Sequence, residues 1–206
     1  MKEVIPCSSG SKAIEALDNG GRFYNIFTKA GDDSITSVEL ATVAGVFSNK
    51  QMMSLYFDMA VHDLEPEEQG AIRELLSDDL RMELSKHAPS RWLPSEAKSQ
   101  AQPSSSAIIT GYPRFVENKT EFSGFIMIPM TTGNTTTIMM LPIMDYYDVY
   151  ELRDEGSDQS FFIANVRGEK RLPETLFRFG GVVKQTKKKA AEEPKIYLEA
   201  AYFTAL

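Results

Sequence analysis

The stretch PSEAKSQAQPSSSA, from Pro94 to Ala107, separates two parts of the chain that differ in hydrophobic periodicity. It is rich in serine, proline, alanine and glutamine and has almost no large apolar residue, which predicts a linker over residues 94–106. Apolar residues recur at helical spacing before this stretch and at every second position after it. The sequence therefore predicts an α+β protein, with a helical domain over residues 1–93 and an all-β, barrel-like domain over residues 107–206.

About five helices are expected in the first part. Thr36 and Glu39 have the T-x-x-E spacing of a capping box, in which each side chain bonds a backbone N–H group that the first helical turn leaves without a partner. Pro66 and the acidic residues after it suit the first turn of a long helix that ends at Pro89. The expected helical segments are residues 11–21, 22–31, 35–45, 48–64 and 66–89.

Six or seven antiparallel strands are expected in the second part, because apolar runs alternate there with turn residues. The sequence TTGN, residues 131–134, has the composition of a hairpin turn. This number of strands at this spacing is typical of a small barrel or sandwich. The expected strands are residues 107–115, 121–130, 135–145, 146–154, 160–168, 175–186 and 195–206.

The last two of these strands contain FGGVVK, residues 179–184, and IYLEAAYF, residues 196–203. With the polar loop between them, they resemble the closing strands of an OB-fold barrel, in which a glycine lets a strand bend sharply. The resemblance covers about 30 residues and implies an OB-like barrel. The sequence departs from a typical OB barrel, which has five strands and often a helix before the fourth, since residues 168–174 leave room for one turn at most.

The net charge of −7 lies entirely in the first part of the chain. Residues 1–97 carry 9 basic and 16 acidic residues, whereas residues 98–206 carry 13 of each. An acidic domain repels phosphate, so the helical part is a poor candidate for nucleic-acid binding. The second part is neutral, whereas a surface that binds nucleic acid is usually basic.

The apolar hairpin FIMIPMTTGNTTTIMMLPIM, residues 125–144, supports the leading hypothesis about function. Both of its strands are apolar on both faces, although a strand with one face in water alternates apolar and polar residues. Something is therefore expected to cover it: the helical half, a second copy of the chain or a protein partner. Methionine is common on such adaptable contact surfaces. We expect a non-enzymatic binding or assembly module whose contact residues are Phe125, Met127, Met139 and Met140.

A second hypothesis concerns the loop QTKKKAAEEPK, residues 185–195. In an OB-like barrel this loop joins the last two strands, where oligonucleotides commonly bind. Glu192 and Glu193 offset much of its positive charge, which favours a solvated hairpin tip over a binding site. The single-stranded nucleic-acid site of this alternative would consist of Arg178, Lys184, Lys187, Lys188 and Lys189.

A third and weaker alternative is an enzyme of unrecognised type. The chain has only two histidines, His62 and His87, without metal-ligand spacing, and its one cysteine, Cys7, lies near the N-terminus. We therefore expect no catalytic residues, metal or cofactor. The lone cysteine and the lack of a signal-peptide pattern or a membrane-spanning run predict a cytoplasmic protein that does not contact membranes.

Overall fold

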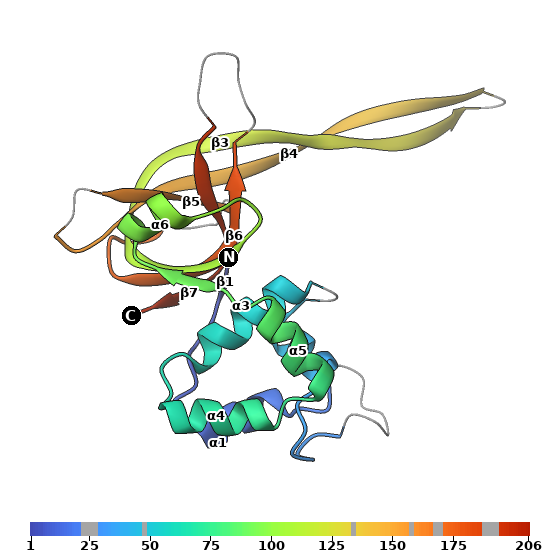
Figure 1. Cartoon of the computed structure of the whole chain (residues 1–206). Helices are drawn as coiled ribbons and strands as arrows, with labels where there is room; N and C mark the ends of the chain where they lie inside the picture. Colours follow the sequence, from blue (N-terminus) through green and yellow to red (C-terminus); the bar gives the residue numbers. More distant parts are fainter. Residues whose placement is uncertain (22–28, 47–48, 133–134, 157–158, 167–170, 187–193) are drawn as a thin grey trace.

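A computed structural model of the 206-residue chain describes residues 1–21, 29–46, 49–132, 135–156, 159–166, 171–186 and 194–206 (Figure 1). Within residues 121–144 it describes the backbone alone. Six helices and one mixed sheet of seven strands make up the described part, so the predicted α+β class is confirmed. The division into domains at residues 94–106 stays a prediction.

Five of the described helices belong to the first half, and the expected helix at residues 22–31 falls largely outside the described residues. The capping box of Thr36 and Glu39 is present, and the side chain of Asn49 accepts the backbone N–H of Met52 at the start of α3. The helices are α1 (Gly10–Leu17), α2 (Ser37–Ala44), α3 (Lys50–Val61), α4 (Pro66–Glu74), α5 (Asp78–Lys86) and α6 (Pro94–Gln100).

The expectation of one helix over residues 66–89 was wrong, because the helix is interrupted between α4 and α5. At the break, the carbonyl of Leu75 accepts the N–H of Ile35 at 2.8 Å. The N–H of Ser77 donates to the Ile35 carbonyl at 2.9 Å. These backbone groups bond a distant segment instead of continuing the helix, and Asp78 and Asp79 then start a new first turn.

The strands are longer and fewer than expected in the second half. Residues 107–115 and 121–130 belong to one strand, and residues 135–145 and 146–153 belong to another, so five strands form where six or seven were expected. Two short strands from the first half join the same sheet. The strands are β1 (Lys2–Glu3), β2 (Ser90–Trp92), β3 (Ser106–Thr132), β4 (Thr135–Arg153), β5 (Ser160–Val166), β6 (Phe177–Gln185) and β7 (Ile196–Ala205).

The five long strands close into a barrel. Neighbours pair in the order β3, β4, β5, β7 and β6, and β6 pairs back onto β3. The pairing of β5 with β7 is parallel and the other four pairings are antiparallel. A closed five-stranded barrel of this kind is OB-like. Its interior is filled by side chains with no exposed surface, among them Ile109, Tyr150, Ile163, Phe179 and Leu198.

Helix α6 lies inside the segment that was expected to be a linker, and it packs on the barrel (Figure 1). The side chain of Ala97 is 0% exposed and belongs to the barrel core together with Leu152 and Phe161. Glu96 accepts the backbone N–H of Leu93 and so stabilises the start of the helix. The buried residues of this helix are Pro94 and Ala97, which a search for large apolar residues does not detect.

Helix α3 joins the helical half to the barrel. Leu55 and Met59 of α3 share an apolar cluster with Ile108 of β3 and Tyr202 of β7. The hydroxyl of Tyr202 donates to the carbonyl of Ala44, and burial raises the pKa of this phenol to about 12. A separate apolar cluster therefore lies between the two halves of the chain and holds them together.

Candidate assembly arm and binding groove

Strands β3 and β4 continue far beyond the barrel as a two-stranded ribbon (Figure 1). Pairing between β4 and β5 begins at Tyr147 and covers only the barrel end of β4. Pairing between β3 and β4 continues beyond the barrel, from Thr120 opposite Tyr146 to Thr132 opposite Thr135. In this extension, β3 and β4 pair only with each other among the described strands. We call residues 120–132 and 135–146 the arm.

The register of the arm places apolar residues opposite one another along most of its length. Met127 lies opposite Met140 and Ile128 lies opposite Met139, while Phe125 lies opposite Pro142. Residues 124–144 include no charged residue. The backbones of the four predicted contact residues thus lie on one two-stranded ribbon. The structure does not describe their side chains. An isolated two-stranded hairpin is at best marginally stable in water, so the arm needs a surface to pack on.

A groove of about 220 Å³ lies at the root of the arm, on the outer face of the barrel. Tyr147 and Val149 reach it from β4, because they alternate with residues such as Tyr150 that fill the barrel interior. The register pairs Val149 with Ala164 of β5, so the floor continues from strand to strand. The lining consists of Val116, Glu117, Lys119, Tyr147, Val149, Phe162, Ile163, Ala164, Thr186, Lys195, Ile196 and Tyr197.

A β-bulge positions one edge of this groove. The register between β3 and β4 shifts between Phe115 and Glu117, so Val116 is an extra residue that has no direct partner on β4. Its side chain is 46% exposed, which is unusual for a valine in a strand. Phe115, its neighbour, packs edge to face on Tyr150, with ring centroids 5.7 Å apart. Because Val116 is extra, Glu117 lies opposite Val149, so the bulge places two consecutive residues of β3 at the groove.

The charge of the groove is low. Glu117 and Lys119 form an ion pair at 3.0 Å, which leaves Lys195 as the one further charged residue among the described lining residues. Eight of the twelve lining residues are aliphatic or aromatic. Such a surface suits an apolar ligand better than a phosphate backbone, which binds where several cations gather.

Two of the five residues proposed for nucleic-acid binding lie among the described residues, and each of them contacts a carboxylate. Arg178 is only 6% exposed, and its guanidinium bonds the carboxylate of Asp63 at 3.1 Å. Lys184 lies 3.5 Å from the carboxylate of Glu199. Lys187, Lys188 and Lys189 lie outside the described residues. Arg178 thus joins the barrel to the helical half, a role that the alternation of residues along its strand did not reveal.

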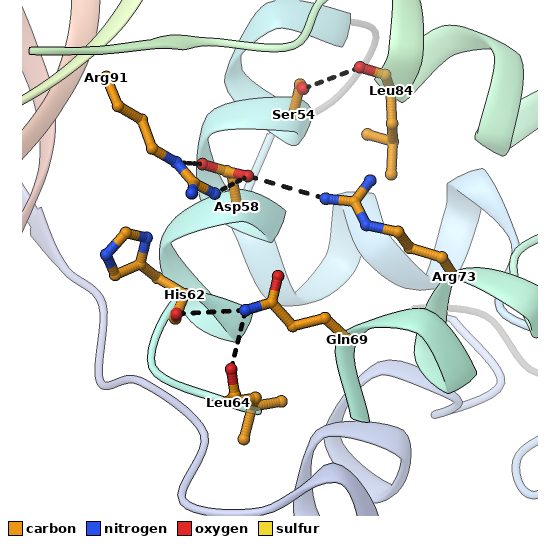
Figure 2. Close-up of polar contacts among 8 residues, drawn as sticks. All are labelled: Ser54, Asp58, His62, Leu64, Gln69, Arg73, Leu84 and Arg91. Atoms are coloured by element: carbon orange, nitrogen blue, oxygen red, sulfur yellow. Dashed lines mark hydrogen bonds and ion pairs between the residues drawn. The ribbon is translucent and has the colours of Figure 1, made fainter. Parts of the chain in front are cut away.

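A cluster of charged residues lies where α3 and α4 meet β2 (Figure 2). The Asp58 side chain is 10% exposed and accepts two hydrogen bonds from Arg91, at 2.7 and 2.9 Å. A second guanidinium, that of Arg73, lies 3.9 Å from the same carboxylate. Gln69 donates to the carbonyls of His62 and Leu64 and so closes the end of α3. These contacts hold elements together and include no group aimed into the groove.

His62 lies at the end of α3 beside this cluster (Figure 2). Its buried Nδ1 atom has no hydrogen-bond partner. Burial lowers the pKa of His62, and the nearby guanidinium groups of Arg178 and Arg91 lower it further. The carboxylates of Asp63 and Asp58 raise this pKa, but burial and the two guanidinium groups outweigh them.

Neither a metal site nor a membrane span is found in the described part of the chain. No group of three or more His, Cys, Asp or Glu side chains is arranged to hold a metal ion there. No helix of the described residues is long and apolar enough to cross a membrane. The expectation that the protein lacks catalytic residues and cofactors stays a prediction.

Comparison with known proteins does not identify a family. No family model matches the sequence, and no curated protein sequence is similar to it. Among solved structures, the N-terminal domain of an archaeal MCM aligns over 94% of this chain and 91% of its own length, with 10% identity and a TM-score of 0.42. A likeness at this level supports no conclusion about activity, so the function has to be argued from the arm and the groove.

Sequence reasoning identified the arm but missed the groove. The arm was detectable because its apolar residues are contiguous in the sequence. The groove brings together short pieces of four strands, and its residues look like ordinary barrel positions in each piece. The nearest signal in the sequence was the aromatic content of β4, β5 and β7, with Tyr147, Phe162 and Tyr197 at positions that alternate with the core.

Proposed function

We propose that the protein is a non-enzymatic assembly module that associates with a second copy of itself through the arm. The observation that carries this proposal is the continuous β3–β4 pairing out to Thr132 and Thr135, beyond the reach of every other described strand. This pairing presents a methionine-rich ribbon, uncharged over residues 124–144, away from the barrel and away from the helical half (Figure 1). Burial of apolar area would provide the driving force.

The size of the arm suits a stable interface. Its two strands contain roughly 25 residues, and an interface of standard size involves about 20–30 residues on each side. Both outer edges of the ribbon also have backbone groups that no described strand pairs with, and such edges are templates for pairing with another chain. A second copy offers the same uncharged ribbon and the same edges.

The test is the mass of the full chain in solution. The parent chain is expected to run as a dimer or larger in size-exclusion chromatography with light scattering, at both low and high salt. Changing Met127→Asp and Met139→Asp together is expected to give a monomer, since each strand of the arm then carries a charge in the interface. Far-ultraviolet circular dichroism should show that the helices are retained.

A matched variant controls for the added charge. Ser11→Asp with Ser99→Asp adds the same two charges at exposed positions on α1 and α6, and it is expected to leave the mass unchanged. A parent chain that is monomeric at high micromolar concentration would refute the proposal. An oligomer that persists in the Met127/Met139 variant would refute it as well.

A further inference from the structure

The groove at the root of the arm points to the place where the arm of a second copy docks. We infer that the tip half of each arm lies in the groove of the partner copy, so that two chains exchange arms about a two-fold axis. This inference rests on the proposed self-association, and it names the surface that receives the arm. It follows from the position of the groove, its chemistry and the length of the arm.

Position is the first argument. Val116, Glu117 and Lys119 of the groove belong to β3 just before the arm begins at Thr120, and Tyr147 belongs to β4 just after the arm ends. The groove is therefore continuous with the base of the arm. When two arms lie side by side and antiparallel, the tip of each arm reaches the base of the other. A two-fold interface of this kind uses the same two surfaces twice and closes on itself, which prevents open-ended growth.

Chemistry is the second argument. The floor of the groove is formed by side chains such as Val149, Phe162, Ala164 and Ile196, and residues 124–144 of the arm carry no charge. Two large apolar side chains at or beside the groove are exposed although each sits in a strand: Val116 at 46% and Val166 at 59%. The uncharged part of a partner's arm, residues 124–144, would bury this apolar surface without bringing a further charge into the groove.

Length is the third argument. Thirteen residues of β3, Thr120–Thr132, extend over roughly 40 Å at the rise of a β-strand. The tip of an arm therefore cannot bend back into the groove of its own chain while the ribbon stays paired. Occupation of the groove by an arm needs a second chain, and this makes the inference testable by cross-linking between chains.

The experiment uses two full-length chains, each with one cysteine. In a Cys7→Ser background, one chain carries Thr132→Cys at the arm tip and the other carries Val116→Cys in the groove. A disulfide needs Cα atoms within about 7 Å of each other, so it reports direct apposition. We expect the mixed chains to form the cross-linked heterodimer as the main product under mild oxidation. A control mixture replaces the groove variant with Glu15→Cys, an exposed position on α1, and should yield little.

The outcomes separate the inference from the proposed function. If the mixture stays a dimer by light scattering but does not cross-link, or if Thr132→Cys chains link only to each other, groove docking is wrong while self-association stands. If the chains are monomeric, both fail. Binding of a fluorescent oligothymidylate that Val116→Glu abolishes would assign the groove to single-stranded nucleic acid and would overturn the arm as its occupant.

Discussion

Gly180 of β6 lies so close to Met59 of α3 that a Cβ atom on the glycine would approach the methionine sulfur to 2.5 Å. Met59 is fully buried between the helical half and the barrel, so its side chain cannot swing into solvent without exposing apolar surface. The contact sets how closely α3 can approach the sheet. It also explains why a glycine stands in the middle of a strand, a position where glycine by itself weakens the sheet.

The substitution Gly180→Ala should therefore destabilise the protein. Overpacking of a buried contact costs about 1–3 kcal/mol, and here it falls on the junction between the two halves. The urea midpoint of unfolding measures the effect. The double variant Gly180→Ala with Met59→Ala should be more stable than the sum of the two single changes predicts, because the shortened side chain makes room for the new methyl group. Strictly additive effects would show that the two residues do not press on each other.

Removing the carboxylate of Asp58 should also destabilise the fold. Asp58→Ala leaves Arg91 and Arg73 without their shared partner, and charged hydrogen bonds of this kind contribute about 1.5–3 kcal/mol. The matched control is Asp78→Ala, which removes an ion pair with Arg81 on the surface, where the Asp78 side chain is 94% exposed. That change should cost less than about 1 kcal/mol. Equal losses of the free energy of unfolding in the two variants would contradict the structural role of the cluster.

His62 should make stability depend on pH below neutrality. Its pKa in the folded protein lies below the ordinary value of 6.5, so the unfolded chain binds a proton more readily than the folded one. The stability that the neutral imidazole contributes is complete above about pH 6.5 and is lost as the pH falls below it.

The variant His62→Leu isolates this effect, because leucine fills the site and cannot bind a proton. Urea midpoints of the variant should fall less steeply than those of the parent between about pH 7 and pH 5. A parent profile that is already flat over this range would show that the burial of His62 has no energetic consequence.

Helix α6 should tolerate enlargement only on its outer side. Ala97→Leu adds three carbon atoms inside the barrel core and should cost about 1–3 kcal/mol. Lys98→Leu places the same side chain at the adjacent, exposed position of the same helix and should change stability by less than about 0.5 kcal/mol. Thermal unfolding of both variants measures the difference. A loss in the Lys98 variant that matches the loss in the Ala97 variant would mean that α6 does not dock through Ala97.

The sequence allowed prediction of those features that rest on contiguous residues. The capping box of Thr36 and Glu39, the apolar hairpin and the closing strands of the barrel all have their signals within about 30 residues. These signals reflect local hydrogen bonding and side-chain periodicity, which do not depend on the rest of the fold.

The features that were missed depend on contacts between distant segments. The break at Leu75–Ser77 forms because Ile35 bonds to it, and nothing within the helical pattern itself marks that position strongly. Ala97 was assigned to a linker because its burial comes from a barrel made of later residues. Arg178 was predicted to contact phosphate. Its partner in the structure, Asp63, lies 115 residues away, so the sequence around Arg178 does not reveal the ion pair.

The order in which the sheet forms follows from the way residues 2–4 meet residues 202–204. Lys2 and Glu3 pair with Tyr202 and Phe203, and the hydroxyl of Thr204 donates to the carbonyl of Val4 across 200 positions. During synthesis, β1 has no partner until β7, made about 200 residues later, has emerged. Contacts of such high sequence separation form slowly, so the pairing of β1 is a late step of sheet formation. Until then, β1 is an unpaired strand end, and such ends are templates for pairing with another chain.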